Sequence, residues 1–230
     1  MTVPDPSWRL RLSILLDGWE RAHAAFDDAV GRLGDRHRSR TGELPTCPTC
    51  TSAACCRQLA VAGIDEALVI ARVLRRTRRA TPALRDALYE AGRAAEASGR
   101  TAHFAAQVPC PLLEDSRCTV YEVRPTACRG CLSLDSPSRC SPPSGQRVRY
   151  LNAIPVEGVY LRMLRQRQRD LGLGADRVYM ASIPRAVAVA LDVLKAPSYE
   201  AALRVLRSEP FPTVDEAATW FAGRSPWSAP

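Results

Sequence analysis

Nine cysteines are the residues of this chain whose types and spacing could do chemistry. The first cluster has the spacing C-x2-C-x4-C-C, and five further cysteines follow after a long interval. In chain order they are Cys47, Cys50, Cys55, Cys56, Cys110, Cys118, Cys128, Cys131 and Cys140. Each cluster contains a C-x2-C pair, and such a turn lets two sulfurs converge on one ion. The spacing therefore indicates a metal or iron–sulfur site rather than a set of small buried side chains.

The sequence predicts a cytoplasmic protein that is not bound to a membrane. A helix that crosses a membrane needs about eighteen or more consecutive apolar residues, and no such run is present. The short apolar cluster at 12–16 ends at Asp17 without a small-residue cleavage site, so we expect no secretory signal. Because the cytosol keeps thiols reduced, the cysteines are expected to bind metal rather than form disulfides.

The positive charge is weak evidence about partners. The chain has 32 basic and 24 acidic residues, a formal net charge of +8, and a single lysine among its basic residues. This value counts every cysteine as neutral, so thiolates bound to metal would lower it. The arginine run at 72–79 has no interleaved aromatic residues and is predicted to be a solvated helix end. We therefore do not expect a nucleic-acid partner.

The pattern of apolar residues predicts a mostly helical single domain over 1–230. Apolar residues step by three and four over 4–34, which predicts a long amphipathic helix, followed by a polar loop at 34–42. A cysteine-cluster core over 41–145 would then be covered by this N-terminal helix (1–40) and by C-terminal helices (146–230), and no internal repeat is evident. Further helices are predicted at 64–79, 81–98, 156–171, 184–194, 199–207 and 214–221, the last of them opened by a capping box at 213–216.

The segment around the second cysteine cluster is expected to contain little β structure and irregular cysteine-rich loops. Residues 110–124 have the pattern of a short hairpin that turns at 114–117, so Cys110 and Cys118 would flank the turn. Pro125 can begin a helical turn, which would bring the following C-x2-C pair in from another side. The site is thus expected to join one hairpin, one helical turn and the first cluster.

The two motifs resemble those of the cysteine-cluster proteins named for their CxxCxxxCC motif. The resemblance covers about residues 44–135 and is carried by Cys47-x2-Cys50-x4-Cys55-Cys56 and by Cys110-Pro-Leu-Leu-x4-Cys118-Thr-Val-Tyr121-Glu-Val-Arg124-Pro125-x2-Cys128-Arg129. It implies a zinc- or iron-chelating domain, often an iron–sulfur protein. One departure is that four residues separate Cys50 from Cys55 where the family name implies three, so either Cys55 or Cys56 would be the ligand. A distant similarity to flagellin lysine N-methylases implies an enzymatic alternative.

Ligation by thiolates alone favours an iron–sulfur cluster or zinc. The candidate ligands are Cys47, Cys50, Cys55, Cys56, Cys110, Cys118, Cys128 and Cys131. We expect an iron–sulfur cluster because neither motif contains histidine, although neither ferredoxin spacing is present. Zinc is the alternative, because the two C-x2-C pairs could form one four-thiolate site.

Two arginines of the second motif are predicted to lie next to the metal ligands. The guanidinium groups of Arg124 and Arg129 could donate hydrogen bonds to thiolate sulfurs and tune the potential of a cluster. In the other interpretation, Arg124 binds backbone carbonyls and holds the hairpin in shape. Tyr121 is expected to be a packing residue, and His23 a core histidine on the apolar face of the first helix.

No recognised catalytic motif is present in the sequence. The first hypothesis is a protein that uses an iron–sulfur cluster in electron transfer or redox sensing with a redox partner protein of unknown identity. The second is a structural or chelating zinc protein. The third is a protein-modifying enzyme, by the remote resemblance to the methylases. The sequence does not predict the oligomeric state.

Overall fold

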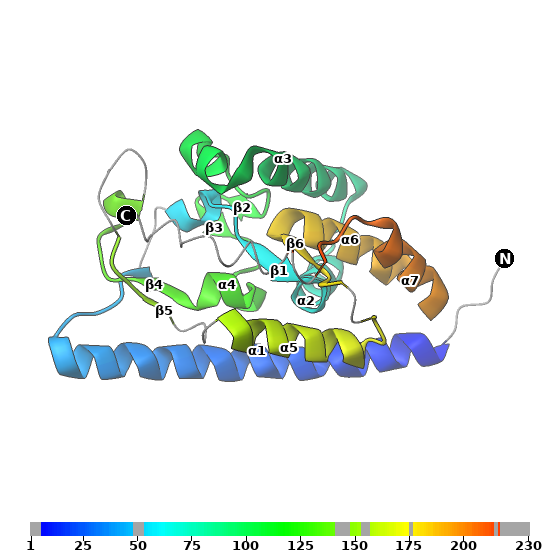
Figure 1. The fold of residues 1–230 in the computed structure, drawn as a ribbon, viewed down its shortest axis with the longest axis horizontal. Helices are drawn as coiled ribbons and strands as arrows, with labels where there is room; N and C mark the ends of the chain where they lie inside the picture. Colours follow the sequence, from blue (N-terminus) through cyan, green and yellow to red (C-terminus); the bar gives the residue numbers. More distant parts are fainter. Residues whose placement is uncertain are drawn as a thin grey trace.

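The computed structural model describes residues 6–47, 53–140, 148–152, 157–174, 177–213 and 216. This described part is mostly helical, as predicted, with three small antiparallel strand pairs. The long helix α1 (Pro6–Thr41) lies along one edge of the molecule, and the other elements gather on one side of it (Figure 1). Within the described residues, no helix is long and apolar enough to cross a membrane.

Two strand–helix units form the centre of the core. In chain order their elements are β1 (Val61–Gly63), α2 (Ile64–Arg76), β6 (Met180–Ser182) and α6 (Ile183–Lys195). Each strand runs directly into its helix, the strands pair antiparallel, and the helices pack against each other. Both strands are too short to show an alternating pattern, which is why the sequence did not predict them.

The two units are related by an approximate two-fold axis. The amide of Ile64 donates to the carbonyl of Tyr179 at 2.8 Å, and the amide of Ile183 donates to the carbonyl of Ala60 at 2.9 Å, so exchanging the units exchanges the two bonds. Identical residues occupy the equivalent positions Ala62/Ala181, Ile64/Ile183, Ala67/Ala186 and Ala71/Ala190. This symmetry of the fold rests on a few small and apolar positions that let two helices approach closely, which is why no repeat is evident in the sequence.

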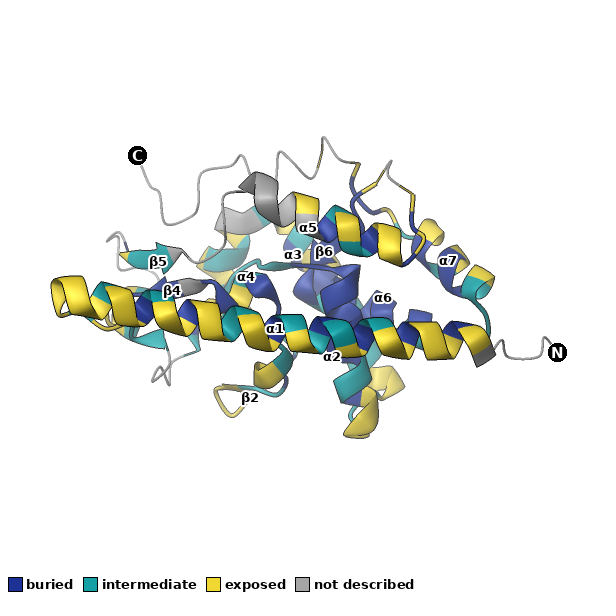
Figure 2. Cartoon of the chain, turned by 90° about the horizontal axis from the view of Figure 1, so that it is seen from below, coloured by how far each residue is buried: buried dark blue, intermediate teal, exposed yellow. Residues whose placement is uncertain are grey.

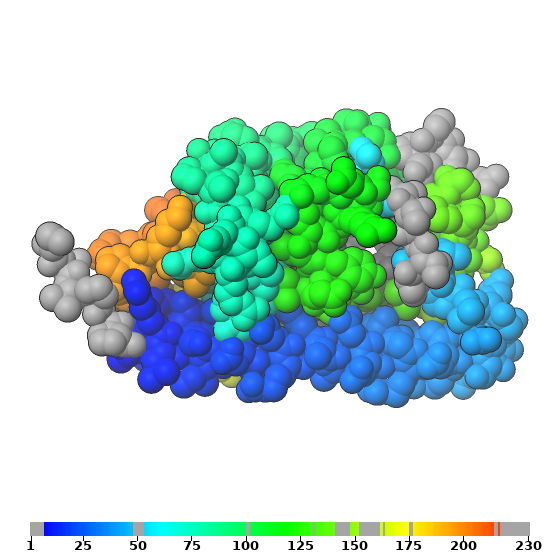
Figure 3. Space-filling view, turned by 180° about the vertical axis from the view of Figure 1, so that it is seen from behind, coloured from blue at the N-terminus to red at the C-terminus, as the bar shows by residue number. Residues whose placement is uncertain are grey.

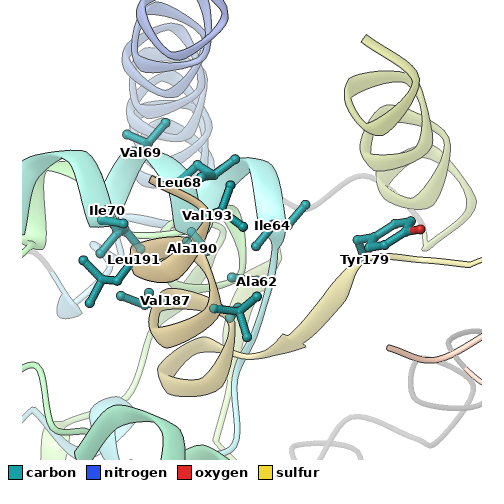
Figure 4. Packing of buried hydrophobic residues seen from close by; sticks show 14 of the residues in the cluster. Ala62, Ile64, Leu68, Val69, Ile70, Tyr179, Val187, Ala190, Leu191 and Val193 are labelled. Atoms are coloured by element: carbon teal, nitrogen blue, oxygen red, sulfur yellow. The ribbon is translucent and has the colours of Figure 1, made fainter. Parts of the chain in front are cut away.

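Side chains of α2 and α6 fill the space between these helices. Leu68 and Ile70 of α2 and Val187 and Leu191 of α6 are almost fully buried (Figure 4). Burial of one such side chain stabilises the folded state by about 1.5–3 kcal/mol. The core therefore fixes the start of α2, which lies next to the cysteine segments.

Helix α1 is longer than predicted. Its apolar stripe from Leu12 to Val30 faces the core, while its other face is exposed (Figure 2). The polar loop expected at 34–42 is wrong, because the helix continues to Thr41. It ends where Gly42 adopts a φ of 76° and donates its amide to the carbonyl of Arg38 at 2.8 Å. A left-handed glycine after the last helical residue is a common helix end.

Helix α3 (Pro82–Ala106) packs on α6 and begins as predicted, with the Thr81 side chain accepting from the amide of Leu84 at 3.1 Å. Gly99, with a φ of 74°, interrupts the helix near its predicted end at 98, and helical structure then resumes. Gly92 lies against α6, where an added Cβ would come within 2.5 Å of the amide nitrogen of Arg185. This close approach fixes how α3 sits on the core.

The C-terminal part contains the predicted helices α5 (Glu157–Asp170) and α7 (Tyr199–Ser208). The helix predicted at 214–221 lies outside the described residues except for Glu216. The capping box predicted with it is present, because the amide of Thr213 donates to Glu216 Oε2 at 2.7 Å and the amide of Glu216 donates to Thr213 Oγ1 at 3.3 Å.

Candidate metal centre

Two adjacent cysteines of the first cluster lie on the 3-10 helix η2 (Ala54–Arg57). Cys55 is exposed and Cys56 is half-buried. The carbonyl oxygen of Cys56 accepts from the amide of Cys110 at 2.8 Å, so the backbone joins the first cluster directly to the second. Cys50 lies outside the described residues.

The predicted hairpin is present, with strands β2 (Leu113–Glu114) and β3 (Arg117–Cys118). The two residues between the strands both have positive φ, as a two-residue type I′ turn requires. Leu113 pairs with Cys118, and its amide donates to the carbonyl of Cys110 at 2.9 Å. Cys110 and Cys118 therefore lie close together across the hairpin, and both are half-buried.

The helical turn predicted after the hairpin is α4 (Thr126–Arg129), and its third residue is Cys128. The carbonyl of Pro125 accepts from the amides of Cys128 and Arg129, at 2.9 and 3.1 Å. The strand β4 (Cys131–Ser133) follows α4 directly and pairs with β5 (Tyr150–Asn152), with Cys131 opposite Asn152. Helix α4 contacts α1, and seen from behind, the green segment that includes it lies over the middle of α1 (Figure 3).

Four thiols from η2, the hairpin and α4 interact electrostatically. They belong to Cys55, Cys110, Cys118 and Cys128. Burial raises the pKa of Cys110 to about 11, with a smaller contribution from Cys118. Burial also raises the pKa of Cys118, to which Cys55 adds, and it raises the pKa of Cys128 well above its usual value, to which the other three thiols add. We call these four side chains the four-thiol group.

Cys128 combines an exposed side chain with a strongly raised pKa. The two observations agree if protein atoms crowd the sulfur on most sides while one side stays accessible, because little water can then solvate a thiolate. The crowding decides the protonation state, so the Cys128 thiol is neutral near pH 7.

The donor chemistry of the four-thiol group fits a soft metal ion or an iron–sulfur cluster. Thiols whose pKa is raised stay protonated near neutral pH, whereas a bound cation favours thiolates and reverses this preference. Within the described ranges, no three His, Cys, Asp or Glu side chains are already arranged to hold a metal ion. Binding therefore requires the four sulfurs to approach one another further.

Two other cysteines meet at Ser133. The amide of Ser133 donates to Cys47 Sγ at 3.0 Å, and Cys140 Sγ donates to Ser133 Oγ at 3.6 Å. Ser133 is two residues beyond Cys131, and the 3-10 helix η4 (Pro137–Cys140) contacts η2. The structure thus places Cys47 beside Ser133 and Cys128 with the four-thiol group. Cys140 was not among the predicted ligands, and only its residue type could have indicated it.

Arg129 holds the segment that carries Cys128 in place. It is 1% exposed, and its guanidinium donates to the carbonyls of Glu122 and Arg124 and forms an ion pair with Asp27 of α1. Arg124 lies over the ring of Tyr121 at 3.8 Å and donates to the Tyr121 carbonyl at 2.9 Å. The contacts of Arg124 match the interpretation in which it holds the hairpin, and it also partly offsets the burial that raises the pKa of Cys118.

A set of buried charged residues that the sequence did not indicate lies at the start of α2. His23 Nε2 lies 3.8 Å from Glu66 Oε1, and Arg167 Nη1 donates to Asp65 Oδ2 at 3.0 Å. Burial lowers the pKa of His23 to about 4, opposed by Glu66, and burial raises the pKa of Asp65 to about 6, to which Glu66 adds. In the sequence, acidic residues in the first turn of a helix look like ordinary partners of the helix dipole, so nothing marks them as buried.

The arginine run at the end of α2 makes ion pairs and backbone contacts. Arg72 pairs with Asp17 and Glu20 of α1 at 2.6 and 2.5 Å, Arg75 donates to a carbonyl at the end of α6, and Arg79 pairs with a carboxylate of the hairpin. The prediction of a solvated helix end holds for Arg75, which is exposed, and is wrong for Arg72, whose side chain is largely buried against α1.

Comparisons of the chain with protein families, with curated proteins and with solved structures find no match. The resemblance to the CxxCxxxCC proteins therefore stays a prediction from the motif residues. What is known of the candidate site rests on the chemistry and placement of its own side chains.

Proposed function

We propose that the chain binds an iron–sulfur cluster through Cys55, Cys110, Cys118 and Cys128 and uses it in electron transfer or redox sensing. The observation that supports this proposal is that four thiols from three separate segments lie near enough to influence one another's pKa. Four thiolates are the usual ligand set of such clusters. When bound, the cluster supplies one-electron redox chemistry.

The surroundings of the four thiols suit this role. Cys110 and Cys118 are half-buried, which limits the access of water, and the positive charge of Arg124 favours the thiolate form of Cys118. Cys55 and Cys128 are exposed, so a partner protein could approach this side of the site. Both features match a centre that exchanges electrons with another protein.

A structural zinc ion is the second candidate. The segments that carry the thiols have very little regular structure, namely strands of two residues and a helix of four. Isolated elements of this length are not stable on their own. A zinc ion bound by four thiolates could hold them together, as in small zinc domains.

The test is to measure iron, acid-labile sulfide and zinc, with a visible spectrum, in the full untagged chain purified without oxygen. We expect a brown protein in which iron and sulfide are present in similar amounts. Cys128→Ser should lose most of both, whereas Cys140→Ser is the matched control and should keep them. Zinc without sulfide would overturn the iron–sulfur proposal in favour of the zinc role, and a wild-type protein without either metal would overturn both.

A further inference from the structure

Glu66 is a buried carboxylate that joins the core to the helix of Cys128. It is 1% exposed and is the third residue of α2. Its Oε2 accepts from the amide of Gly63 at 3.3 Å, and its Oε1 accepts from the amide of Thr126 at 2.8 Å. Thr126 is the first residue of α4, two residues before Cys128. One side chain thus binds two backbone segments far apart in the sequence.

Helix α4 depends on such contacts for its position. A helix of four residues makes too few internal hydrogen bonds to offset the entropy of ordering it. Its last residue, Arg129, is held by carbonyl groups of the preceding segment and by Asp27 of α1. Its first amide is held by Glu66, so hydrogen bonds hold both ends of the helix that carries the Cys128 thiol.

The equivalent unit of the core shows that its fold does not require a carboxylate at this position. The two-fold axis relates Gly63 to Ser182 and Glu66 to Arg185. The amide of Ser182 is bound by Glu96 from α3 at 2.8 Å. The strand–helix junction can therefore be capped from outside, and Glu66 differs from its equivalent by reaching toward α4.

The charge of Glu66 does not favour a metal-bound Cys128 thiolate. His23 does not neutralise it, because burial lowers the pKa of His23 to about 4, and neither ring nitrogen of His23 makes a hydrogen bond within the described residues. Glu66 also adds to the raised pKa of Cys128, so its charge opposes thiolate formation. What Glu66 offers the site is therefore the placement of its acceptor oxygens rather than its charge.

We propose that Glu66 is a positioning residue of the metal centre: its hydrogen bond to the Thr126 amide holds α4 where the Cys128 thiol can join the other three. This inference rests on the proposed function, because it assigns a role toward the same four-thiol group. The role needs an acceptor oxygen as far from the backbone as the carboxylate oxygens of glutamate. A glutamine keeps one acceptor oxygen, which can bind the Thr126 amide, and gives up only the longer bond to the Gly63 amide. An aspartate keeps the charge but is one methylene shorter.

The experiment is an anaerobic titration of the metal-free full chain with Co²⁺, followed by the thiolate-to-cobalt charge-transfer absorption. Glu66→Gln should bind Co²⁺ within a few-fold of the wild type, whereas Glu66→Asp should bind about 10–100-fold more weakly, the usual effect of losing a group that orients a ligand. Asp65→Asn is the matched control, because it removes a neighbouring buried carboxylate that is paired with Arg167. It should leave the affinity within a few-fold of the wild type.

The outcomes separate the two proposals. A folded wild-type chain that gives no charge-transfer band overturns the proposed function and this inference with it. Two other results would overturn only the positioning role. In both, the wild type gives a band, and either Glu66→Asp binds Co²⁺ as tightly as the wild type or Glu66→Gln binds it more weakly than Glu66→Asp. If Glu66→Asp does not fold, the Co²⁺ affinity of Glu66→Gln tests the role. A folded Glu66→Gln chain that binds Co²⁺ about tenfold or more weakly than the wild type contradicts the positioning role.

Discussion

The amide of Cys110 donates a hydrogen bond to the carbonyl of Cys56 at 2.8 Å, which joins the two cysteine clusters of the chain through their backbones. The bond places η2 beside the start of the hairpin. Since Cys55 precedes Cys56, its thiol lies close enough to those of Cys118 and Cys128 to raise their pKa values. The two clusters are therefore held together by a backbone hydrogen bond and not only by interactions between their thiols.

The reactivity of Cys110 tests this environment in the metal-free protein. Only thiolates react with iodoacetamide, and burial raises the pKa of Cys110 to about 11 from the usual 9.0. At pH 8 we expect Cys110 to react about 100-fold more slowly in the folded than in the urea-unfolded chain, since two pKa units correspond to that factor. Peptide mapping by mass spectrometry measures both rates. Similar rates in the two states would show that Cys110 is not buried.

Removal of the Arg129 side chain should destabilise the protein strongly. Arg129→Ala leaves a cavity and deprives two carbonyls and Asp27 of their donor, so we expect a loss of about 3–5 kcal/mol in the free energy of unfolding. Arg124→Ala is the control, because Arg124 contacts Tyr121 and makes only a longer ion pair with Asp27, at 3.8 Å, and it should cost about 1 kcal/mol or less. Urea unfolding of the metal-free proteins measures both. Equal losses would contradict the assignment of Arg129 as the main anchor.

Much of the fold could be predicted from the sequence, because its helices are amphipathic and have clear starts. The stripe along α1, the Thr81 cap and the capping box of Thr213 are local signals, and each lies where it was predicted. The strands β1 and β6 could not be predicted, because three residues show no periodicity and their pairing is set by tertiary contact. The end of α1 was missed because arginine is a good helix former, so a polar segment stayed helical.

Two glycines in helices should respond oppositely to alanine. Gly92→Ala places a Cβ within 2.5 Å of the amide nitrogen of Arg185, so overpacking between α3 and α6 should cost about 1–3 kcal/mol. At Gly31 of α1 nothing lies within 4 Å of the added Cβ, and the change should stabilise by about 0.5–1 kcal/mol because alanine favours the helix. Thermal unfolding of the two variants beside the wild type measures the difference. A neutral Gly92→Ala would mean that α3 can move away from α6 at little cost.

The candidate site was only partly predictable. Residue type and spacing indicated thiolate chemistry. They could not show which cysteines lie near one another, because this depends on tertiary contacts between segments far apart in the sequence. The C-x2-C spacing favoured a site shared by Cys47 and Cys128, whereas the structure places Cys47 at Ser133 and Cys128 beside Cys55. Glu66 was missed for the same reason, since its contact with α4 spans 60 residues of sequence.

His23 and Asp65 give the stability of the protein opposite dependences on pH. The pKa of His23 is about 4 in the folded protein and 6.5 ordinarily, so between these values the unfolded chain binds more protons and stability falls as the pH falls. The pKa of Asp65 is about 6 rather than 3.8, so between these values the folded chain binds more protons and stability falls as the pH rises. The two effects overlap between pH 4 and 6 and oppose each other there.

Single variants should therefore separate the two slopes. Asp65→Asn removes the Asp65 effect, so between pH 6 and pH 4.5 its free energy of unfolding should fall more steeply with falling pH than that of the wild type. His23→Leu removes the His23 effect, so over the same range its free energy of unfolding should fall less steeply than that of the wild type, while His103, whose pKa burial also lowers, titrates in both variants. Neither difference in slope should exceed about 1.4 kcal/mol per pH unit, the limit for a single proton. Urea unfolding of the metal-free chains measures them, and differences of the same sign in both variants would show that the opposing titration does not come from this pair.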